Sequence, residues 1–307
     1  MDRWQAMRVF VKVAESGGFA EAARRLFMSP PAVTRAVAFL EDAIGAQLLV
    51  RTTRSLKLTE TGERYLHDCQ RILADLADAE AAAAGSYTTP TGTLIVTAPV
   101  MFGQLHVLPV VMDYLGQHPI VSAQTLFLDR ITNLVEEGMD VAIRISHLPD
   151  SELTAIRVGS MRRVICASPA YLAEHGEPRN PAGLAGHSVI ARIGAWPRLE
   201  WHFGRDEKIH VGIQPRLMCN LNESGISAAI SGWGLVRVFA YQVDTALREG
   251  RLRTVLTEFE EEPVPVHIVH AGGRGPSAKV RSFVDFAVER LRMNPIFGDL
   301  AQNRPHS

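Results

Sequence analysis

Residues 10–62 read FVKVAESGGFAEAARRLFMSPPAVTRAVAFLEDAIGAQLLVRTTRSLKLTETG, and this stretch decides the fold of the N-terminal part. Apolar residues at helical spacing predict two short helices, first at Val9, Phe10 and Val13 and then at Ala22, Ala23 and Leu26. Ser29 offers an oxygen that can cap a third helix. Pro30 and Pro31 suit its first turn, where a missing N–H costs nothing.

The third helix has two distinct faces. Its apolar stripe consists of Val33, Val37, Leu40 and Ile44, and its outer face carries Thr34, Arg35 and Ala38. A helix of roughly 14 residues is about 21 Å long and fits the major groove of B-DNA. A loop with Arg51, Arg54 and Lys57 follows. The pattern predicts a winged helix-turn-helix.

Composition limits the class of protein. The chain has 307 residues, 47% hydrophobic and 21% charged, which is ordinary for a globular protein of more than one domain. No apolar run approaches the 18 residues typical of a membrane span, and the first residues lack the layout of a secretion signal. Cys69, Cys166 and Cys219 lie far apart, which favours reduced thiols and a cytoplasmic protein.

Charge is distributed unevenly. Residues 1–58 carry nine Lys or Arg against five Asp or Glu, whereas the remaining residues carry 23 against 28. A basic N-terminal segment followed by an acidic remainder suits a DNA-contacting module. A surplus of this many basic residues is equally common on a solvated surface.

A long helix is predicted from about residue 59 to residue 84. One apolar seam follows it, through Tyr65, Cys69, Ile72, Leu76, Ala79 and Ala83. Such a seam favours pairing with the same helix of a second subunit, and the alternative is packing on its own domain. The Gly/Ser/Thr/Pro segment 85–92 then forms a linker.

Strands and helices alternate after the linker, which is typical of parallel sheets with helical crossovers. Strands are expected at 93–99, 121–128, 141–145, 163–167, 189–192, 200–203, 211–213, 216–219, 235–239, 252–255 and 263–271. Helices are expected at 105–116, 131–137, 223–231, 241–249 and 277–291. Two α/β lobes of this kind would place a ligand site at their seam.

These segments together resemble the LysR-type transcriptional regulators. The likeness is carried by residues 10–26, 29–49 and 51–62, and downstream by 129–145, 162–176 and 277–286. The resemblance implies a mixed α and α/β protein with a winged helix-turn-helix, a dimerising linker helix and a two-lobed effector domain like a periplasmic binding protein. One departure is Pro30, where the family often has Gln.

The expected domains follow from this layout. Residues 1–58 would form the DNA-binding domain, residues 59–91 the linker helix and hinge, and residues 92–307 the effector-binding domain. Lobe 1 would span about 92–161 and 267–300, and lobe 2 about 162–266. The expected assembly is a dimer or tetramer.

The candidate DNA-binding residues lie on the third helix and the wing: Ser29, Pro30, Pro31, Thr34, Arg35, Arg51, Arg54 and Lys57. Arg35 can bond a guanine bidentately or clamp a phosphate, and Ser29 can cap its helix or touch a phosphate. The wing cations suit phosphates or a minor groove, and the alternative is a solvated loop.

The candidate effector-binding residues are Thr97, Ala98, Pro99, Val100, Arg144, His202 and Asn222. Backbone N–H groups where strand 93–99 meets a helix suit an anion. Arg144 lies in an apolar strand and needs a partner, either a carboxylate on an effector or an internal contact to Asp129 or a helix end. His202 and Asn222, the latter as a helix cap, could line the opposite lobe. The expected effector is a small metabolite, and Arg144 favours an anionic one.

No motif predicts catalysis, a cofactor or a metal site. Walker, GxGxxG, GxSxG and HExxH patterns are absent, and residues 258–262 suggest a solvated acidic turn. Cys166 lies in an apolar strand and is expected to fill the core, with redox sensing as the alternative. The sequence therefore predicts an effector-controlled transcription regulator that binds double-stranded DNA and no membrane. The second class considered is a solute-binding module or enzyme with an incidental helical domain.

Overall fold

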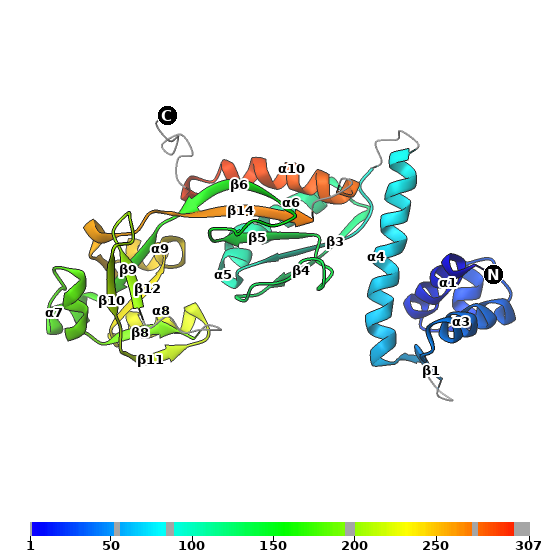
Figure 1. Ribbon diagram of the computed structural model, residues 1–307, viewed down its shortest axis with the longest axis horizontal. Coiled ribbons are helices and arrows are strands. Elements are labelled where there is room, and N and C mark those ends of the chain that lie inside the picture. The colour runs from blue at the N-terminus through cyan, green and yellow to red at the C-terminus, as the bar shows by residue number, and fades with distance from the viewer. Residues whose placement is uncertain (1, 52–55, 84–88, 194–199, 272–275, 298–307) are drawn as a thin grey trace. The chain divides into compact units, whose positions relative to one another are not determined.

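The computed structural model describes residues 2–51, 56–83, 89–193, 200–271 and 276–297 (Figure 1). The chain divides into two compact units, the first formed mainly by Met1–Gly92 and the second by most of the remaining residues. The expected mixed α and α/β fold, with an N-terminal helix-turn-helix and a two-lobed α/β part, is confirmed. No helix among the described residues is both long and apolar enough to cross a membrane.

The first unit is a small helical core with a two-stranded wing. It contains helices α1 (Arg3–Ser16), α2 (Phe19–Arg25), α3 (Pro30–Ile44) and α4 (Glu60–Ala83), and antiparallel strands β1 (Leu49–Arg51) and β2 (Leu56–Leu58). Three fully buried residues, Phe10, Val33 and Leu40, form the centre of this core. The helical periodicity read from the sequence is therefore the packing pattern of the unit.

Local signals define most helix ends in this unit. Asp2 accepts a hydrogen bond from the N–H of Gln5 and caps α1, and Gly45 ends α3 with a φ of 74°. Thr59 caps α4 by accepting a hydrogen bond from the N–H of Gly62. The expected side-chain cap by Ser29 is wrong, because Ser29 occupies the N-cap position of α3 without a side-chain hydrogen bond.

Helix α4 does not carry one continuous exposed seam. Cys69 is fully buried against the core of the first unit, and the Tyr65 ring lies 6.0 Å from the ring of Phe10 on α1. Ile72 and Leu76, one and two turns further on, are exposed. The first half of the predicted seam thus packs on its own domain. The side chains of Ala79 and Ala83 lie outside the described residues.

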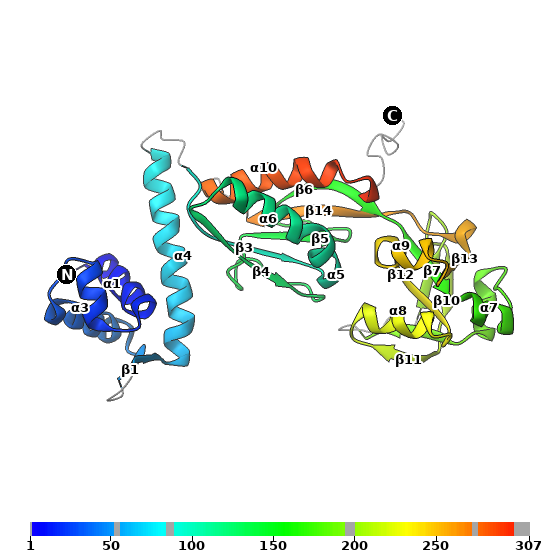
Figure 2. The same cartoon turned by 180° about the vertical axis from the view of Figure 1, so that it is seen from behind.

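Lobe 1 of the second unit is a five-stranded sheet with helices on one face. Its strands, in spatial order, are β4 (Val121–Phe127), β3 (Gly92–Ala98), β5 (Val141–Ile145), β14 (Val264–Ala271) and β6 (Leu153–Met161). Its helical segments are α5 (Val100–Phe102), η1 (Gly103–Val107), α6 (Leu108–Gln117), α10 (Ala278–Arg292) and η4 (Pro295–Phe297). Buried residues of α6 and α10 share one core with β3, β5, β6 and β14. Figure 2 shows α10 along the paired strands β6 and β14.

Lobe 2 has a second five-stranded sheet, in the order β11 (Pro215–Cys219), β8 (Val189–Arg192), β12 (Leu235–Phe239), β7 (Arg163–Ala167) and β13 (Arg253–Val255). Helices α8 (Asn222–Ile230) and α9 (Ala240–Arg248) share one apolar cluster with this sheet. The other cluster contains residues of α7 (Pro169–His175), of η2 (Pro181–Gly186) and of β9 (Glu200–Phe203), which pairs with β10 (Ile209–Gly212). A short turn, η3 (Thr257–Phe259), precedes the return to lobe 1.

The fold differs from the expected parallel α/β pattern both in strand direction and in its elements. In lobe 1, β14 runs antiparallel to β5, and in lobe 2, β7 runs antiparallel to β12 and β13. Strand β6 was not predicted, and it pairs antiparallel with β14 where the chain passes between the lobes. The helix expected at 131–137 is a series of turns. The chain returns from lobe 2 to lobe 1 before residue 264, rather than at about residue 266 as expected. The reason is that β14 already pairs with β6 from Val264.

Candidate DNA interface and effector site

The outer face of α3 is free for contact. Ser29, Pro30, Pro31 and Arg35 are exposed and Thr34 is half-buried, while Val33, Ala36 and Val37 hold the opposite side of the helix in the core. No hydrogen bond or ion pair within the described residues engages the Arg35 guanidinium. The sequence assigned these faces correctly because burial follows the 3.6-residue period.

Several of the other basic residues in this unit are already paired. Lys12 lies 2.8 Å from Glu15, and Arg24 and Arg25 both pair with Glu21. Lys57 on β2 is exposed and makes no ion pair within the described part of the chain. The side chains of Arg51 and Arg54 lie outside the described residues.

The wing is tied to α3 by one carboxylate. Glu41 Oε1 accepts hydrogen bonds from the N–H groups of Leu48 and Leu49, at 2.8 and 3.1 Å. In addition, Thr59 donates its hydroxyl hydrogen to the carbonyl of Gln47. The outer face of α3 and the wing therefore belong to one rigid module, a requirement for simultaneous contact with a groove and its flanking phosphates.

The start of α5 in lobe 1 already holds an anion, the side chain of Asp129. The N–H of Val100 donates to Asp129 Oδ1 at 3.0 Å. The Thr97 hydroxyl donates to the carbonyl of Leu126 at 2.6 Å, and Ala98 accepts from the N–H of Leu128. Thr97 and Ala98 are buried in the sheet, whereas Pro99 and Val100 are half-buried.

Asp129 of lobe 1 also forms an ion pair with a residue of lobe 2. Arg192, at the end of β8 in lobe 2, donates to the backbone carbonyl of Asp129 at 2.7 Å. The same guanidinium lies 3.7 Å from Asp129 Oδ2. Arg192 also lines a pocket in lobe 2 together with Cys219, Leu221 and Asn222.

Aromatic rings of the two lobes also pack against one another. We call this contact region, together with the Arg192–Asp129 pair, the lobe junction. The Phe102 and His106 rings of lobe 1 lie 5.3 and 5.5 Å from the ring of Tyr241 on α9, in edge-to-face geometry. Burial raises the pKa of Tyr241, and the nearby carboxylates of Asp129 and Glu223 raise it further. Burial also lowers the pKa of His106, so this ring is neutral at physiological pH.

Two carboxylate oxygens at this junction lack donors. Asp129 Oδ2 and Glu223 Oε2 are buried and accept no hydrogen bond from the described residues. A buried acceptor without a donor costs about 1–3 kcal/mol. Both oxygens can therefore accept a hydrogen bond from a group other than the described residues.

Two family models cover most of the chain. One, described as LysR substrate binding domain, matches residues 88–292. The other, described as Bacterial regulatory helix-turn-helix protein, lysR family, matches residues 4–63. The chain belongs to the LysR family of transcriptional regulators. Regulators of this family bind DNA and small-molecule effectors and form oligomers.

Individual relatives agree with this assignment. CrgA of Neisseria meningitidis serogroup B (strain MC58), an HTH-type transcriptional regulator, is 34% identical over 297 residues, covering 94% of this chain and 97% of CrgA. An HTH-type transcriptional regulator of Xanthomonas campestris pv. campestris is 34% identical over 291 residues, covering 93% and 85%. The solved structure of CrgA from Neisseria meningitidis has a TM-score of 0.60 at 33% identity and covers 94% of this chain and 98% of its own.

In this LysR-type regulator, Arg144 makes an internal contact, one of the two alternatives expected for it, and His202 lies on β9 of lobe 2. The Arg144 guanidinium donates to the backbone carbonyl of Thr132 at 2.7 Å, and not to Asp129 or a helix end. His202 lies on β9 beside Glu200 and Glu207 and lines a different pocket from the one that Asn222 lines. Among the described residues, neither side chain has a hydrogen bond or ion pair with Asp129, Arg192 or Tyr241.

Asn222 reaches the vicinity of the junction, although not as a helix cap. It is the first residue of α8, and Leu221 occupies the N-cap position without a side-chain hydrogen bond. Among the candidate effector residues in the described part of the chain, Val100 contacts Asp129, and Asn222 lines a pocket with Arg192, which also contacts Asp129. Sequence reasoning missed Arg192, Glu223 and Tyr241. The signal for Arg192 was a charged residue at the end of an apolar strand.

Proposed function

We propose that this LysR-type regulator recognises an operator by inserting α3 into the major groove while the β1–β2 wing contacts the DNA backbone. The observation that carries the proposal is the exposed, unpaired Arg35 on the outer face of a helix whose other face is locked in the core. Pro30, Pro31 and Thr34 flank it, and the free Ser29 hydroxyl is available to a phosphate. Lys57, together with Arg51 and Arg54, would add affinity that depends on salt.

Substitution of Arg35 tests this function. Arg35→Ala should weaken binding to the DNA that flanks the regulator's own gene by about 1–3 kcal/mol, or roughly 5–150-fold, because a bidentate base contact is lost. Binding to random DNA at the same salt concentration should change much less. The measurement is a fluorescence-anisotropy titration on both DNAs.

Arg24→Ala is the matched control, since Arg24 is exposed and already paired with Glu21. It should leave operator binding within a factor of two or so of the wild type. Equal losses of affinity for operator and random DNA in Arg35→Ala would show that Arg35 contacts only the backbone.

We further propose that a small effector binds at the lobe junction. The support comes from two buried carboxylate oxygens, Asp129 Oδ2 and Glu223 Oε2, which accept no hydrogen bond from the described residues. Polar side chains near them are those of Arg192, Asn222 and Tyr241. The Val100 N–H that would have favoured an anion is occupied by Asp129. The arrangement favours an effector that presents hydrogen-bond donors, such as an amine or hydroxyl, over a simple anion.

Self-association completes the proposed mechanism. Exposed Ile72 and Leu76 on α4 give a second copy of the chain an apolar strip to pack against. Two DNA-binding units held in this way can contact two half-sites. An effector then changes DNA binding only if it has different affinities for the two arrangements of the assembly.

A further inference from the structure

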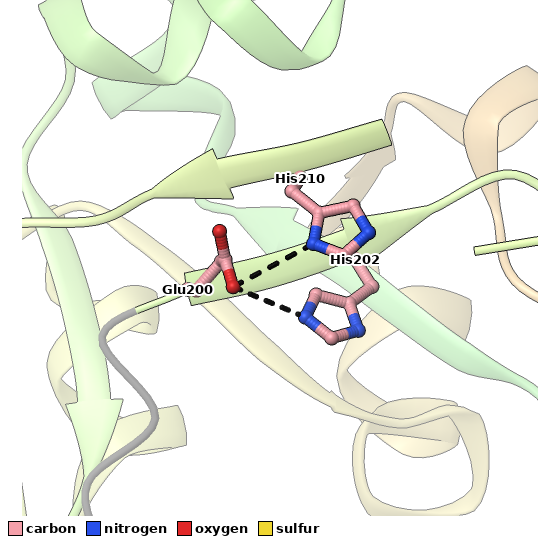
Figure 3. Close-up of side chains that lie close together, drawn as sticks. All are labelled: Glu200, His202 and His210. Atoms are coloured by element: carbon pink, nitrogen blue, oxygen red, sulfur yellow. Dashed lines mark hydrogen bonds and ion pairs between the residues drawn. The ribbon is translucent and has the colours of Figure 1, made fainter. Parts of the chain in front are cut away.

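Two histidines and a glutamate share one face of the β9–β10 hairpin in lobe 2. The antiparallel register places His210 directly opposite His202 and Gly212 opposite Glu200. Because side chains alternate along a strand, Trp201 and Phe203 enter the core while Glu200 and His202 face the other side. Figure 3 shows the three polar side chains of Glu200, His202 and His210 converging.

The distances in this cluster match those of a metal-ligand set. Glu200 Oε2 lies 3.4 Å from His202 Nε2 and 3.6 Å from His210 Nδ1, and the three ligand atoms all lie within 4.8 Å of one another. Zinc bonds of about 2.0–2.1 Å in tetrahedral geometry place neighbouring ligand atoms roughly 3.3 Å apart. Two of the three distances between ligand atoms would therefore have to change by well under about 1 Å for a metal ion to fit.

A second carboxylate orients one of the imidazoles. Glu207 Oε2 lies 3.4 Å from His202 Nδ1, on the opposite side of the ring from Glu200. In many metal sites a carboxylate holds the proton on one ring nitrogen and leaves the other nitrogen free to ligate. Here the proton on Nδ1 would leave Nε2 directed at Glu200 and the metal position.

We propose that Glu200, His202 and His210 bind one divalent transition-metal ion of the zinc class. Two imidazoles and one carboxylate suit Zn²⁺, Co²⁺, Ni²⁺ or Cu²⁺, whereas Mg²⁺ and Ca²⁺ prefer oxygen ligands. The side chains of Glu200 and His210 are about half exposed, at 51% and 50%, so an ion can enter from solvent. Three protein ligands leave a fourth position for water or another group. A bound ion would join β9 to β10 by bonds stronger than the hydrogen bonds of the hairpin.

The test uses the full-length chain, stripped of metal with a chelator and titrated with ZnCl₂ by isothermal calorimetry. The expected result is one saturable site per chain that is lost in His202→Ala and in His210→Ala. Glu207→Gln should weaken the site about 10–100-fold, the usual effect of removing a carboxylate that orients a ligating histidine. MgCl₂ should give no saturable binding at this site.

His147→Gln is the matched control, because His147 is exposed and lies outside the hairpin. It should bind Zn²⁺ as the wild type does. Titration with CoCl₂ gives an independent readout, since tetrahedral Co²⁺ absorbs visible light, and this absorption should disappear in His210→Ala. Unchanged zinc affinity in the double variant His202→Ala/His210→Ala, with the fold intact by circular dichroism, would overturn the proposal. Failure of the wild type to bind one equivalent of either metal would also overturn it.

Discussion

At the scale of single residues, Gly62 shows how one missing side chain sets the distance between α4 and the wing. A Cβ atom at this position would lie 2.0 Å from the backbone carbonyl oxygen of Leu48. That segment cannot move freely, because the N–H of Leu48 is held by Glu41. Close packing of this kind is one reason for a glycine within a helix.

Gly62→Ala should therefore lower the free energy of unfolding by about 1–3 kcal/mol, the usual cost of overpacking. Urea denaturation followed by circular dichroism measures the change. Gly116→Ala is the control, since a Cβ atom added to Gly116 in α6 would meet no other atom within 4 Å. It should be neutral or stabilising because alanine favours helix. Equal stability of both variants would mean that α4 and the wing can separate without cost.

Glu261 shows that an ion pair can depend on residues far away in the sequence. Glu261 belongs to the segment expected to be a solvated acidic turn, yet its side chain is only 5% exposed and accepts hydrogen bonds from Arg163 at 2.5 Å and from Arg237 at 2.7 Å. Burial lowers the pKa of Arg237 to about 10, and Glu261 opposes that shift.

Cys166 is a separate case of burial. It is fully buried, and burial raises the pKa of its thiol to about 12, which fits the expected core role.

At the scale of elements, α4 combines two packing surfaces in one helix. Its first turns complete the core of the first unit through Tyr65 and Cys69, and its later turns expose Ile72 and Leu76. Apolar residues on an exposed helical face favour a partner helix.

Ile72→Glu should shift the chain from its oligomer toward monomer, because a carboxylate would have to be buried in the helix pair. Sedimentation velocity at several protein concentrations measures the shift. Gln70→Glu adds the same charge at an exposed polar position of α4 and should leave the assembly unchanged. If Ile72→Glu has the mass of the wild type at every concentration, the strip is not an interface.

At the scale of the whole molecule, the contact between Arg192 and Asp129 couples the two lobes to the proposed effector site. An effector that donates hydrogen bonds to Asp129 would bind the joined lobes and stabilise them, by about 2.7 kcal/mol at a concentration of 100 times its dissociation constant. A thermal-shift screen should therefore find its hits among metabolites with amine or hydroxyl donors.

Asp129→Asn should abolish the stabilisation by those hits, and Glu258→Gln, which alters an exposed carboxylate elsewhere in lobe 2, should preserve it. A screen whose hits are donor-free anions, unaffected by Asp129→Asn, would contradict the proposed chemistry of the effector.

The sequence by itself determined the family and most of the elements, although not β6 and not the turns at 131–137, where it predicted a helix. The apolar stripe of α3 and the strand–helix alternation are local patterns, and local patterns decide which face of an element is buried. The tertiary structure alone decided the partners: Asp129 at the N–H of Val100, Arg192 against Asp129, and His210 opposite His202. These residues are distant in sequence or depend on strand register. Periodicity predicts burial, but only the packed fold determines which polar groups meet.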